Sequence, residues 1–198
     1  SHIRQVDAII HLVRCFESDK ITHVNSKINP VEDLEIIKTE IILSDLDIIQ
    51  KKLEKGKKKL LEEKEIKILE DKLKQLNDGK EVTTNEKDEE KFLATLGLLS
   101  IKPKIIVCNV DEESLTKGNS FTESVKKNYS NEKVVIICAD IEDQIMGLDN
   151  NERETFMKEI GLNKTGLNQL IKEGYELLNL DTFFTSGPEE SRAWTVEK

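Results

Sequence analysis

The pattern of apolar and polar residues predicts three strands of a parallel sheet. Predominantly apolar runs span residues 6–16, 105–108 and 134–138, and short runs bounded by polar residues are typical of strands buried on both faces. Segments with helical periodicity lie at 120–129, between the second and third runs, and at 162–178, after the third. Strands that alternate with helices along the chain favour an α/β fold built on a parallel sheet.

A different pattern lies between the first and second strands. The segment 33–78 is rich in lysine and glutamate, contains no proline and has a single glycine, Gly56. Its apolar residues recur at helical spacing, which predicts two antiparallel helices that pair as a coiled coil and reverse direction near Gly56. Glu63 and Lys67 are placed for an ion pair on the exposed face, and a third, short helix is expected over 85–96. The apolar positions of the two long helices are Ile42, Leu46, Ile49, Leu53, Ile66, Leu69, Leu73 and Leu76.

The end of the chain changes character again. In residues 181–198, DTFFTSGPEESRAWTVEK, strand-like residues flank a turn at Gly187 and Pro188. This pattern predicts a β-hairpin, the first of a further β-domain.

Composition limits the class of protein. The 198 residues carry a formal net charge of −9, with 35% charged residues, which fits a soluble cytoplasmic protein and argues against a general affinity for nucleic acid. No apolar run reaches the ~18 residues of a membrane span, and no signal peptide precedes the first strand, so we expect no membrane partner. Cys15, Cys108 and Cys138 lie in or at the ends of apolar runs, as reduced, packed thiols do.

The candidate chemistry lies just past the second strand. The stretch IIVCNVDEESL begins at Ile105, and in it an apolar run gives way to Asn109, Val110 and Glu112. Residues that follow a strand at the carboxyl edge of a parallel sheet face the ligand in many α/β proteins. We therefore expect Asn109 and Glu112 to lie at a ligand site, and we expect the acidic segment around Glu112 to begin a helix.

Four strings of the sequence point together to one family. They are VDAIIHLVRCFESDKITHV, NPVEDLEIIKTEIILSDL, KPKIIVCNVDE and GYELLNLDTFFTSGPEESRAWTV. With them the chain resembles the YchF family of Obg-like ATPases, a branch of the P-loop GTPases related to translation factors. The resemblance implies a partial Ras-like nucleotide domain over 1–32 and 99–180, a helical coiled-coil insertion over 33–98, and the start of a C-terminal TGS β-domain over 181–198. It also implies a fragment of a longer enzyme, whose phosphate-binding loop lies upstream of Ser1.

The resemblance further implies a purine-binding role for Asn109, Val110 and Glu112. Related GTPases read guanine with N-K-x-D, in which the Asp carboxylate accepts two N–H bonds from the base. In this chain Val110 replaces the lysine and Glu112 stands in place of the Asp, and the longer side chain does not keep that two-bond geometry. Asn109 and the backbone at Val110 are expected to read the edge of adenine. The family's preference for ATP over GTP is therefore expected, with the Mg²⁺ ligands upstream of Ser1.

Three more residues are candidates for base binding. Cys138 and Ala139 stand where GTPases carry S-A-K and contact the base through backbone groups. Cys138 and Asp140 depart from that pattern, and a helix-capping role is the alternative for Asp140. Phe16 closes the first strand at the same edge, and its ring is expected to stack on adenine, with packing in the core as the alternative.

His23 is the candidate catalytic residue. Phosphoryl transfer to water requires a group that positions the attacking water, usually a glutamine. The family has a hydrophobic residue in that place, so His23, in the loop SDKITHV, becomes the candidate for orienting or deprotonating water. The alternative is a loop histidine bonded to Glu17 or Asp19.

Three functions compete on this evidence. The leading hypothesis is a ribosome-associated ATPase that hydrolyses ATP to ADP and phosphate with Mg²⁺, where the ribosome follows only from the resemblance. RNA contact would use lysines of the coiled coil, such as Lys51, Lys52 and 57–59, or the TGS domain, and would weaken with salt. The second hypothesis is a non-catalytic binding module, because residues 1–198 without a phosphate-binding loop are expected to lack ATPase activity. The third, a structural coiled-coil adaptor, leaves the strand-end residues unexplained.

Overall fold

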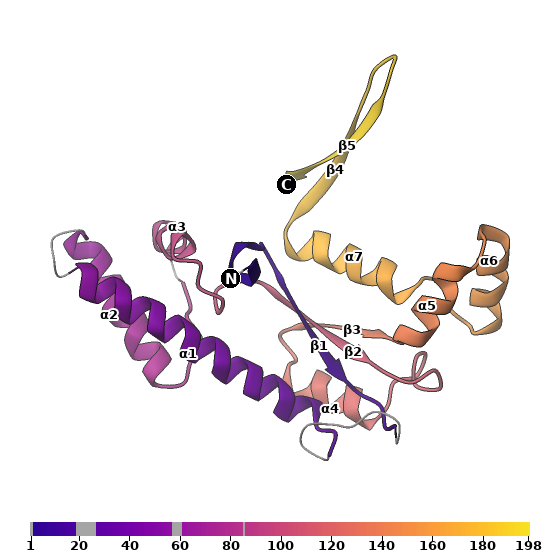
Figure 1. The fold of residues 1–198 in the computed structure, drawn as a ribbon, viewed down its shortest axis with the longest axis horizontal. Coiled ribbons are helices and arrows are strands. Elements are labelled where there is room, and N and C mark those ends of the chain that lie inside the picture. Colours follow the sequence, from indigo (N-terminus) through magenta and orange to yellow (C-terminus); the bar gives the residue numbers. More distant parts are fainter. Residues whose placement is uncertain (1, 19–26, 57–60, 85) are drawn as a thin grey trace. The chain divides into compact units, whose positions relative to one another are not determined.

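The chain forms two compact units that differ in architecture. The computed structural model describes residues 2–18, 27–56, 61–84 and 86–198. A helical unit comprises residues 1–7 and 32–102, and a sheet unit comprises residues 8–31 and 103–198. Figure 1 shows the elements of both units.

Three parallel strands form the sheet, in the order β1-β2-β3. They are β1 (Ile9–Arg14), β2 (Lys104–Asn109) and β3 (Lys133–Ile137). Arg14 pairs with Asn109, and Asn109 pairs with Ile137, so the three strands end level with one another. The predicted α/β class and its parallel sheet are confirmed, and the three carboxyl ends form one edge.

Four helices belong to the sheet unit. They are α4 (Ser120–Asn128), α5 (Ala139–Gly147), α6 (Asn150–Glu159) and α7 (Gly166–Leu177). The predicted helices at α4 and α7 are confirmed, whereas α6 was not predicted. The signal for α6 lies at its start, where Asp149 accepts bonds from the N–H groups of Asn151 and Glu152, and the Glu152 side chain accepts one from the Asp149 N–H. Such a capping box marks a helix start even where apolar periodicity is weak.

Helix α7 packs on β2 and β3 and leaves part of β1 uncovered. Ile10 and Leu12 of β1 pair with Ile105 and Val107, and so share their face of the sheet, yet they are 54% and 63% exposed. The prediction that β1 is buried on both faces is therefore wrong for the described chain, because β1 is an edge strand that extends this face beyond α7. The core of this face consists of Ile105, Val107 and Val135, with Leu170 and Leu177 packed against them.

The helical unit contains the two predicted long helices and the predicted short one. They are α1 (Pro30–Gly56), α2 (Glu63–Asn77) and α3 (Lys87–Thr95), and α1 and α2 run antiparallel (Figure 1). The Glu63–Lys67 ion pair forms at 3.0 Å, as predicted. Among the described residues, no helix is both long enough and apolar enough to cross a membrane. The buried core of the unit is Ile42, Ile49, Leu53, Leu69, Leu76, Val82, Leu93 and Leu98, with the predicted Leu46, Ile66 and Leu73 packed against it.

Two buried charges bind the helical unit together. Asp45 of α1 is fully buried, and its carboxylate accepts bonds from the Leu99 N–H at 2.9 Å, the Ser100 N–H at 2.8 Å and the Ser100 hydroxyl at 2.7 Å. Arg4, in the short 3₁₀ helix His2–Gln5, lies 3.5 Å from the same carboxylate and donates to the Gly97 carbonyl at 2.8 Å. Hydrogen bonds and an ion pair to Asp45 thus hold both the turn after α3 and the start of the chain against α1.

Lys72 of α2 is the second buried charge, and its side chain is 2% exposed. Its ammonium contacts Glu89 of α3 at 2.6 Å and Asp71 at 3.1 Å. Burial lowers the pKa of Lys72, but the bonds to Glu89 and Asp71 outweigh that effect, so the pKa lies above its usual value.

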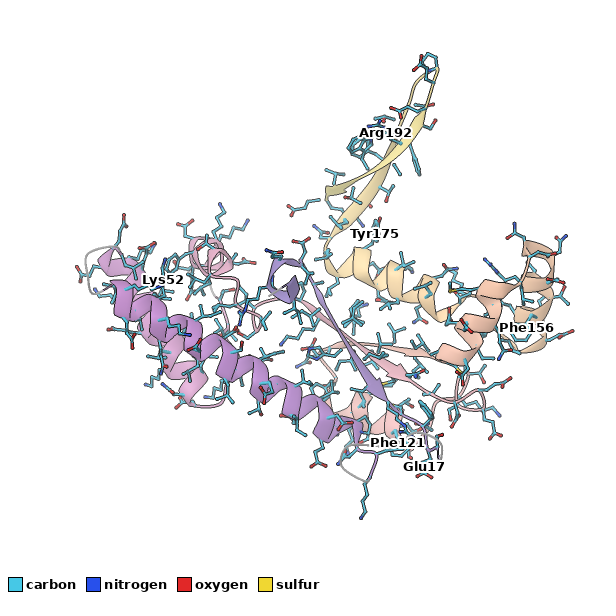
Figure 2. All side chains as sticks on the ribbon, viewed as in Figure 1. Glu17, Lys52, Phe121, Phe156, Tyr175 and Arg192 are labelled. Carbon is cyan, nitrogen blue, oxygen red and sulfur yellow. The ribbon has the colours of Figure 1, made fainter. Side chains whose placement is uncertain are left out.

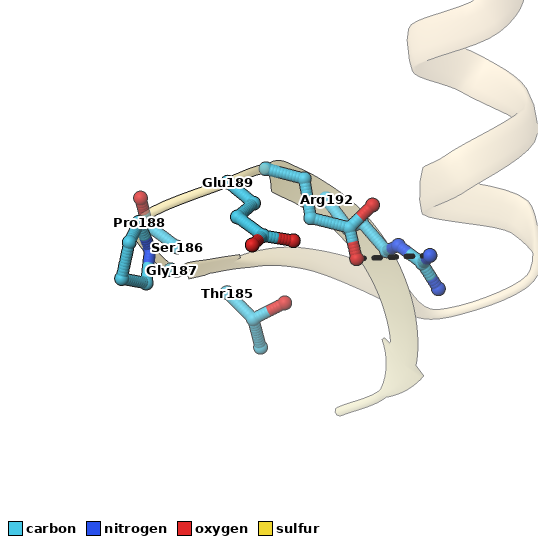
Figure 3. Close-up of a pocket in the computed structure, with 7 residues that line it drawn as sticks. Thr185, Ser186, Gly187, Pro188, Glu189 and Arg192 are labelled. Atoms are coloured by element: carbon cyan, nitrogen blue, oxygen red, sulfur yellow. Dashed lines mark ion pairs between the residues drawn. The ribbon is translucent and has the colours of Figure 1, made fainter.

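The predicted hairpin at the end of the chain is confirmed. Strands β4 (Leu180–Ser186) and β5 (Ser191–Glu197) pair antiparallel, and the Trp194 indole N–H donates to the Thr185 hydroxyl at 2.9 Å. Residues at the turn line a shallow hollow of about 420 Å³, and Arg192 and Glu190 form an ion pair at 2.9 Å. Figure 3 shows the lining residues, with this ion pair as a dashed line. The assignment of this hairpin to a TGS domain stays a prediction.

Candidate nucleotide-base site

The carboxyl edge of the sheet joins two loops through Asn109. Asn109 is the last residue of β2, and its side-chain Oδ1 accepts a bond at 3.0 Å from the N–H of Ala139, the first residue of α5. The next residue, Val110, donates its N–H to the Ile137 carbonyl at 2.8 Å. These two bonds hold the loop after β2 against the loop after β3. Because Oδ1 is committed to Ala139, the Asn109 amide N–H₂ group is the part left for a ligand.

The side chains that follow Asn109 point in different directions. Val110 is 2% exposed, so its side chain packs inward, and with its N–H in use only its carbonyl is left for a base. Glu112 is exposed. The acidic segment does not begin a helix, contrary to the prediction, because Asp111 accepts the Ser114 N–H at 2.9 Å and closes a turn instead. Short polar side chains often bond to nearby backbone in this way and favour turns.

Asn119 is a residue of this edge that the sequence analysis did not single out. Its Nδ2 donates to the Cys15 carbonyl at 2.7 Å and to the Ser114 hydroxyl at 3.2 Å, while its Oδ1 accepts the Thr122 N–H at 3.0 Å. Asn119 therefore caps α4 and also ties the end of β1 to the loop after β2. The sequence signal was the N-cap asparagine itself, which follows Gly118, a residue with a φ of 72°.

Phe16 lies at the same edge, just past β1, and is half-buried. The Arg14 guanidinium stands 4.8 Å from the centre of its ring, and Arg14 Nε donates to the Phe16 carbonyl at 3.0 Å. A second bond at 3.3 Å runs from Arg14 to the Ser18 carbonyl. One face of the Phe16 ring is thus in contact with a cation, a favourable arrangement that also fixes the ring's position.

Cys138 and Asp140 lie at the start of α5. Cys138 is 2% exposed and is the N-cap residue of the helix, whereas Asp140 lies in its first turn, so the suggested capping role of Asp140 is wrong. Burial raises the pKa of the Cys138 thiol, the N–H groups of Ile141 and Asp140 oppose that rise, and the negative charges of Asp140 and Glu112 add to it. The negative charge of Glu112, in the loop after β2, thus contributes to the raised pKa of Cys138 at the start of α5.

The structure brings together most of the predicted base-site residues. Hydrogen bonds join the loop that contains Asn109 and Val110 to the loop that contains Cys138 and Ala139. Phe16 follows the neighbouring strand β1. His23 falls in the segment 19–26, outside the described residues. No group of three or more potential metal-binding side chains occurs among the residues that the structure describes.

Known proteins are similar to this sequence along nearly its whole length, although no protein-family model matches it. The ribosome-binding ATPase YchF of Bacillus subtilis (strain 168) is 37% identical over 100% of this chain and 57% of its own length. The ribosome-binding ATPase YchF of Escherichia coli O157:H7 is 41% identical over 99% of this chain and 56% of its own length. The resemblance to the YchF family is confirmed.

A solved YchF structure has the same fold. The YchF GTPase of Schizosaccharomyces pombe matches with a TM-score of 0.85 and 27% identity, over 99% of this chain and 56% of its own length. The chain thus spans a little over half the length of these YchF relatives. The bacterial YchF proteins are named ATPases and the yeast protein is named a GTPase. The base preference of a YchF-like chain therefore has to be argued from the residues at the base site.

Proposed function

We propose that this chain forms the base-binding edge of a longer, cytoplasmic, ribosome-associated enzyme that hydrolyses ATP in preference to GTP. The observation that carries the proposal is the bond from Ala139 N–H to Asn109 Oδ1, which holds the loops after β2 and β3 together at the carboxyl edge of the sheet. Ligands of open α/β sheets bind at that edge. The family resemblance supports the ribosome as partner.

The Asn109 side chain binds a purine but does not distinguish adenine from guanine. Its free N–H₂ group is a donor, and N7 of the purine ring, an acceptor in both adenine and guanine, suits it. The preference for adenine over guanine then depends on Glu112. A guanine offers two N–H donors on one side, and an aspartate at this position would accept both hydrogen bonds. The extra methylene of Glu112 shifts the carboxylate, so that this pair of hydrogen bonds is not formed.

In catalysis, this chain is proposed to contribute the residues that bind the nucleotide base, and His23. Mg²⁺ would supply positive charge that neutralises the phosphates, as in related enzymes. His23 is proposed to orient the attacking water. For residues 1–198 alone we expect very weak nucleotide binding and no measurable ATP turnover, because the loop that supplies most phosphate contacts is not among them.

Substituting Glu112 tests the proposal. In the longer protein, Glu112→Asp restores the shorter carboxylate, and each hydrogen bond to a charged acceptor contributes about 1.5–3 kcal/mol. The ratio of GTP to ATP affinity is therefore expected to rise at least about tenfold, since 1.4 kcal/mol is a factor of ten. Glu113→Asp is the matched control, because Glu113 is also exposed and lies next to Glu112. An unchanged ratio in Glu112→Asp, or an equal change in the control, would overturn the assignment.

A contact between RNA and the helical unit is a second part of the proposal. Lys51 is already paired with Asp47 at 2.7 Å, and the lysines 57–59 lie outside the described residues. Lys52 projects from the same helix and is labelled in Figure 2. If the helical unit binds RNA, Lys52→Glu should lower the affinity of the longer protein for ribosomes and reduce its dependence on salt. Unchanged affinity would remove this lysine from the interface.

A further inference from the structure

Strand β3 has a free edge with hydrogen-bonding groups directed outward. The Ile137 carbonyl accepts the Val110 N–H, so the backbone of Ile137 faces β2. Backbone groups alternate in direction along a strand, which turns the N–H and C=O of Val134 and Ile136 away from β2. Within the described chain no hydrogen bond to these outward groups is found. Such a row of unpaired groups is a template for one more strand.

The free edge opens into a pocket of about 220 Å³. Val134 and Ile136, the two residues with outward backbone groups, line it. Leu115, from the loop after β2, and Leu162, from the loop before α7, supply apolar walls. The pocket therefore combines a hydrogen-bonding strand edge with an apolar surface for a side chain.

Two lysines give the pocket a positive charge. Lys126 of α4 and Lys164, which precedes α7, both line it, and neither forms an ion pair within the described part of the chain. The Cys108 thiol on β2 is also affected by the charge of Lys126. Its pKa is lowered mainly by a hydrogen bond with Cys15, against the effect of burial, and the charge of Lys126 adds to the lowering. In a chain with a net charge of −9, two unpaired lysines at one strand edge favour an acidic ligand.

We propose that the β3 edge binds an extended, acidic peptide segment of a partner protein by β-strand addition. The peptide backbone pairs with Val134 and Ile136, and its carboxylates lie beside Lys126 and Lys164. This is the known mode in which main-chain bonds provide affinity and flanking side chains provide specificity. A second copy of the same edge is a poor occupant, because pairing two β3 edges would bring these lysines together. The site is separate from the base site and does not depend on the proposed ATPase activity.

The test uses a fluorescent peptide of alternating glutamate and valine. The protein is titrated with this peptide, with a version in which lysine replaces glutamate, and with a version that carries N-methyl groups on its backbone. Only the first peptide is expected to bind, because the second is repelled and the third cannot pair with the strand. In amide NMR spectra of the complex, the largest shifts are expected at Val134 and Ile136.

Charge-reversal variants test whether Lys126 and Lys164 contact the peptide. The double variant Lys126→Glu and Lys164→Glu should weaken binding by about tenfold, as expected for two partly exposed ion pairs. Lys127→Glu is the matched control, because Lys127 lies on the same helix, is exposed and does not line the pocket. The lysines are exposed, and an unchanged amide spectrum of each free variant confirms that it is folded.

Four results would overturn the proposal. They are no binding at millimolar peptide, equal binding of the N-methylated peptide, equal weakening by Lys127→Glu, and displacement of the peptide by a short RNA at lower concentration. The second result would indicate attraction by charge alone, and the last would assign the lysines to nucleic acid.

Discussion

Removing the Asp45 carboxylate is expected to cost a large part of the stability of the helical unit. The carboxylate is fully buried and accepts three hydrogen bonds of 2.7–2.9 Å, with Arg4 at 3.5 Å. The substitution Asp45→Ala leaves the two N–H groups and one hydroxyl without partners and an arginine without its counter-charge. Breaking a buried ionic network from one side costs about 3–5 kcal/mol. A folded domain has about 5–15 kcal/mol of stability in total, so the loss is large.

Urea unfolding followed by far-ultraviolet circular dichroism measures this loss, because most of the helical signal of the unit comes from α1 and α2. A loss of this size lowers the midpoint by about 2 M urea. The control is Asp47→Ala, two residues along the same helix, where the side chain is 58% exposed and pairs with an exposed Lys51. That change should cost less than about 1 kcal/mol. If Asp45→Ala lost no more stability than Asp47→Ala, the network would not hold the unit together.

Substitutions at three other residues have expected outcomes. The pKa of Lys72 is raised in the folded state, so its stabilising effect is complete below its unfolded pKa of about 10.4 and is lost as the pH rises through the folded value. Lys72→Met should therefore flatten the fall in unfolding free energy above pH 10, and an identical alkaline profile would contradict this. Glu142 accepts bonds from the first two N–H groups of α7, at 2.6 and 3.3 Å, so Glu142→Gln should cost about 1–2 kcal/mol in thermal unfolding. Asn109→Asp keeps an acceptor for Ala139 and should leave the melting temperature unchanged, whereas Asn109→Ala should lower it by about 2–4 °C; equal melting temperatures would argue against the tether.

The fold was largely predictable because its elements have strong periodicity. The coiled-coil positions, such as Ile49 and Leu69, repeat at helical spacing and are fully buried in the structure. The strand runs are rich in apolar residues, and all three strands are found. The exposed face of β1 was not predictable, because an apolar residue such as Leu12 has the same pattern whether or not a helix covers it. Helix α6 was missed because it has little apolar periodicity, and its sequence signal is the N-cap residue Asp149.

The base site was predictable only as a list of residue types. Asn109 and Glu112 stand out because they follow an apolar strand, but the bond from Ala139 to Asn109 joins residues 30 positions apart and depends on the level ends of β2 and β3. Asn119 was missed for a related reason. Its capping role is local, whereas its bond to the Cys15 carbonyl spans 104 positions. Long-range bonds of this kind follow from the sheet order, which the pattern of a single sequence does not specify.

Competition between ATP and GTP for the longer protein tests the central claim most directly. With a fluorescent ADP analogue bound, each unlabelled nucleotide is titrated at the same Mg²⁺ and salt concentrations, and the two dissociation constants are compared. A glutamate at position 112 predicts that ATP displaces the analogue with a dissociation constant at least about tenfold lower than that of GTP. A dissociation constant for GTP equal to or lower than that for ATP would contradict the account.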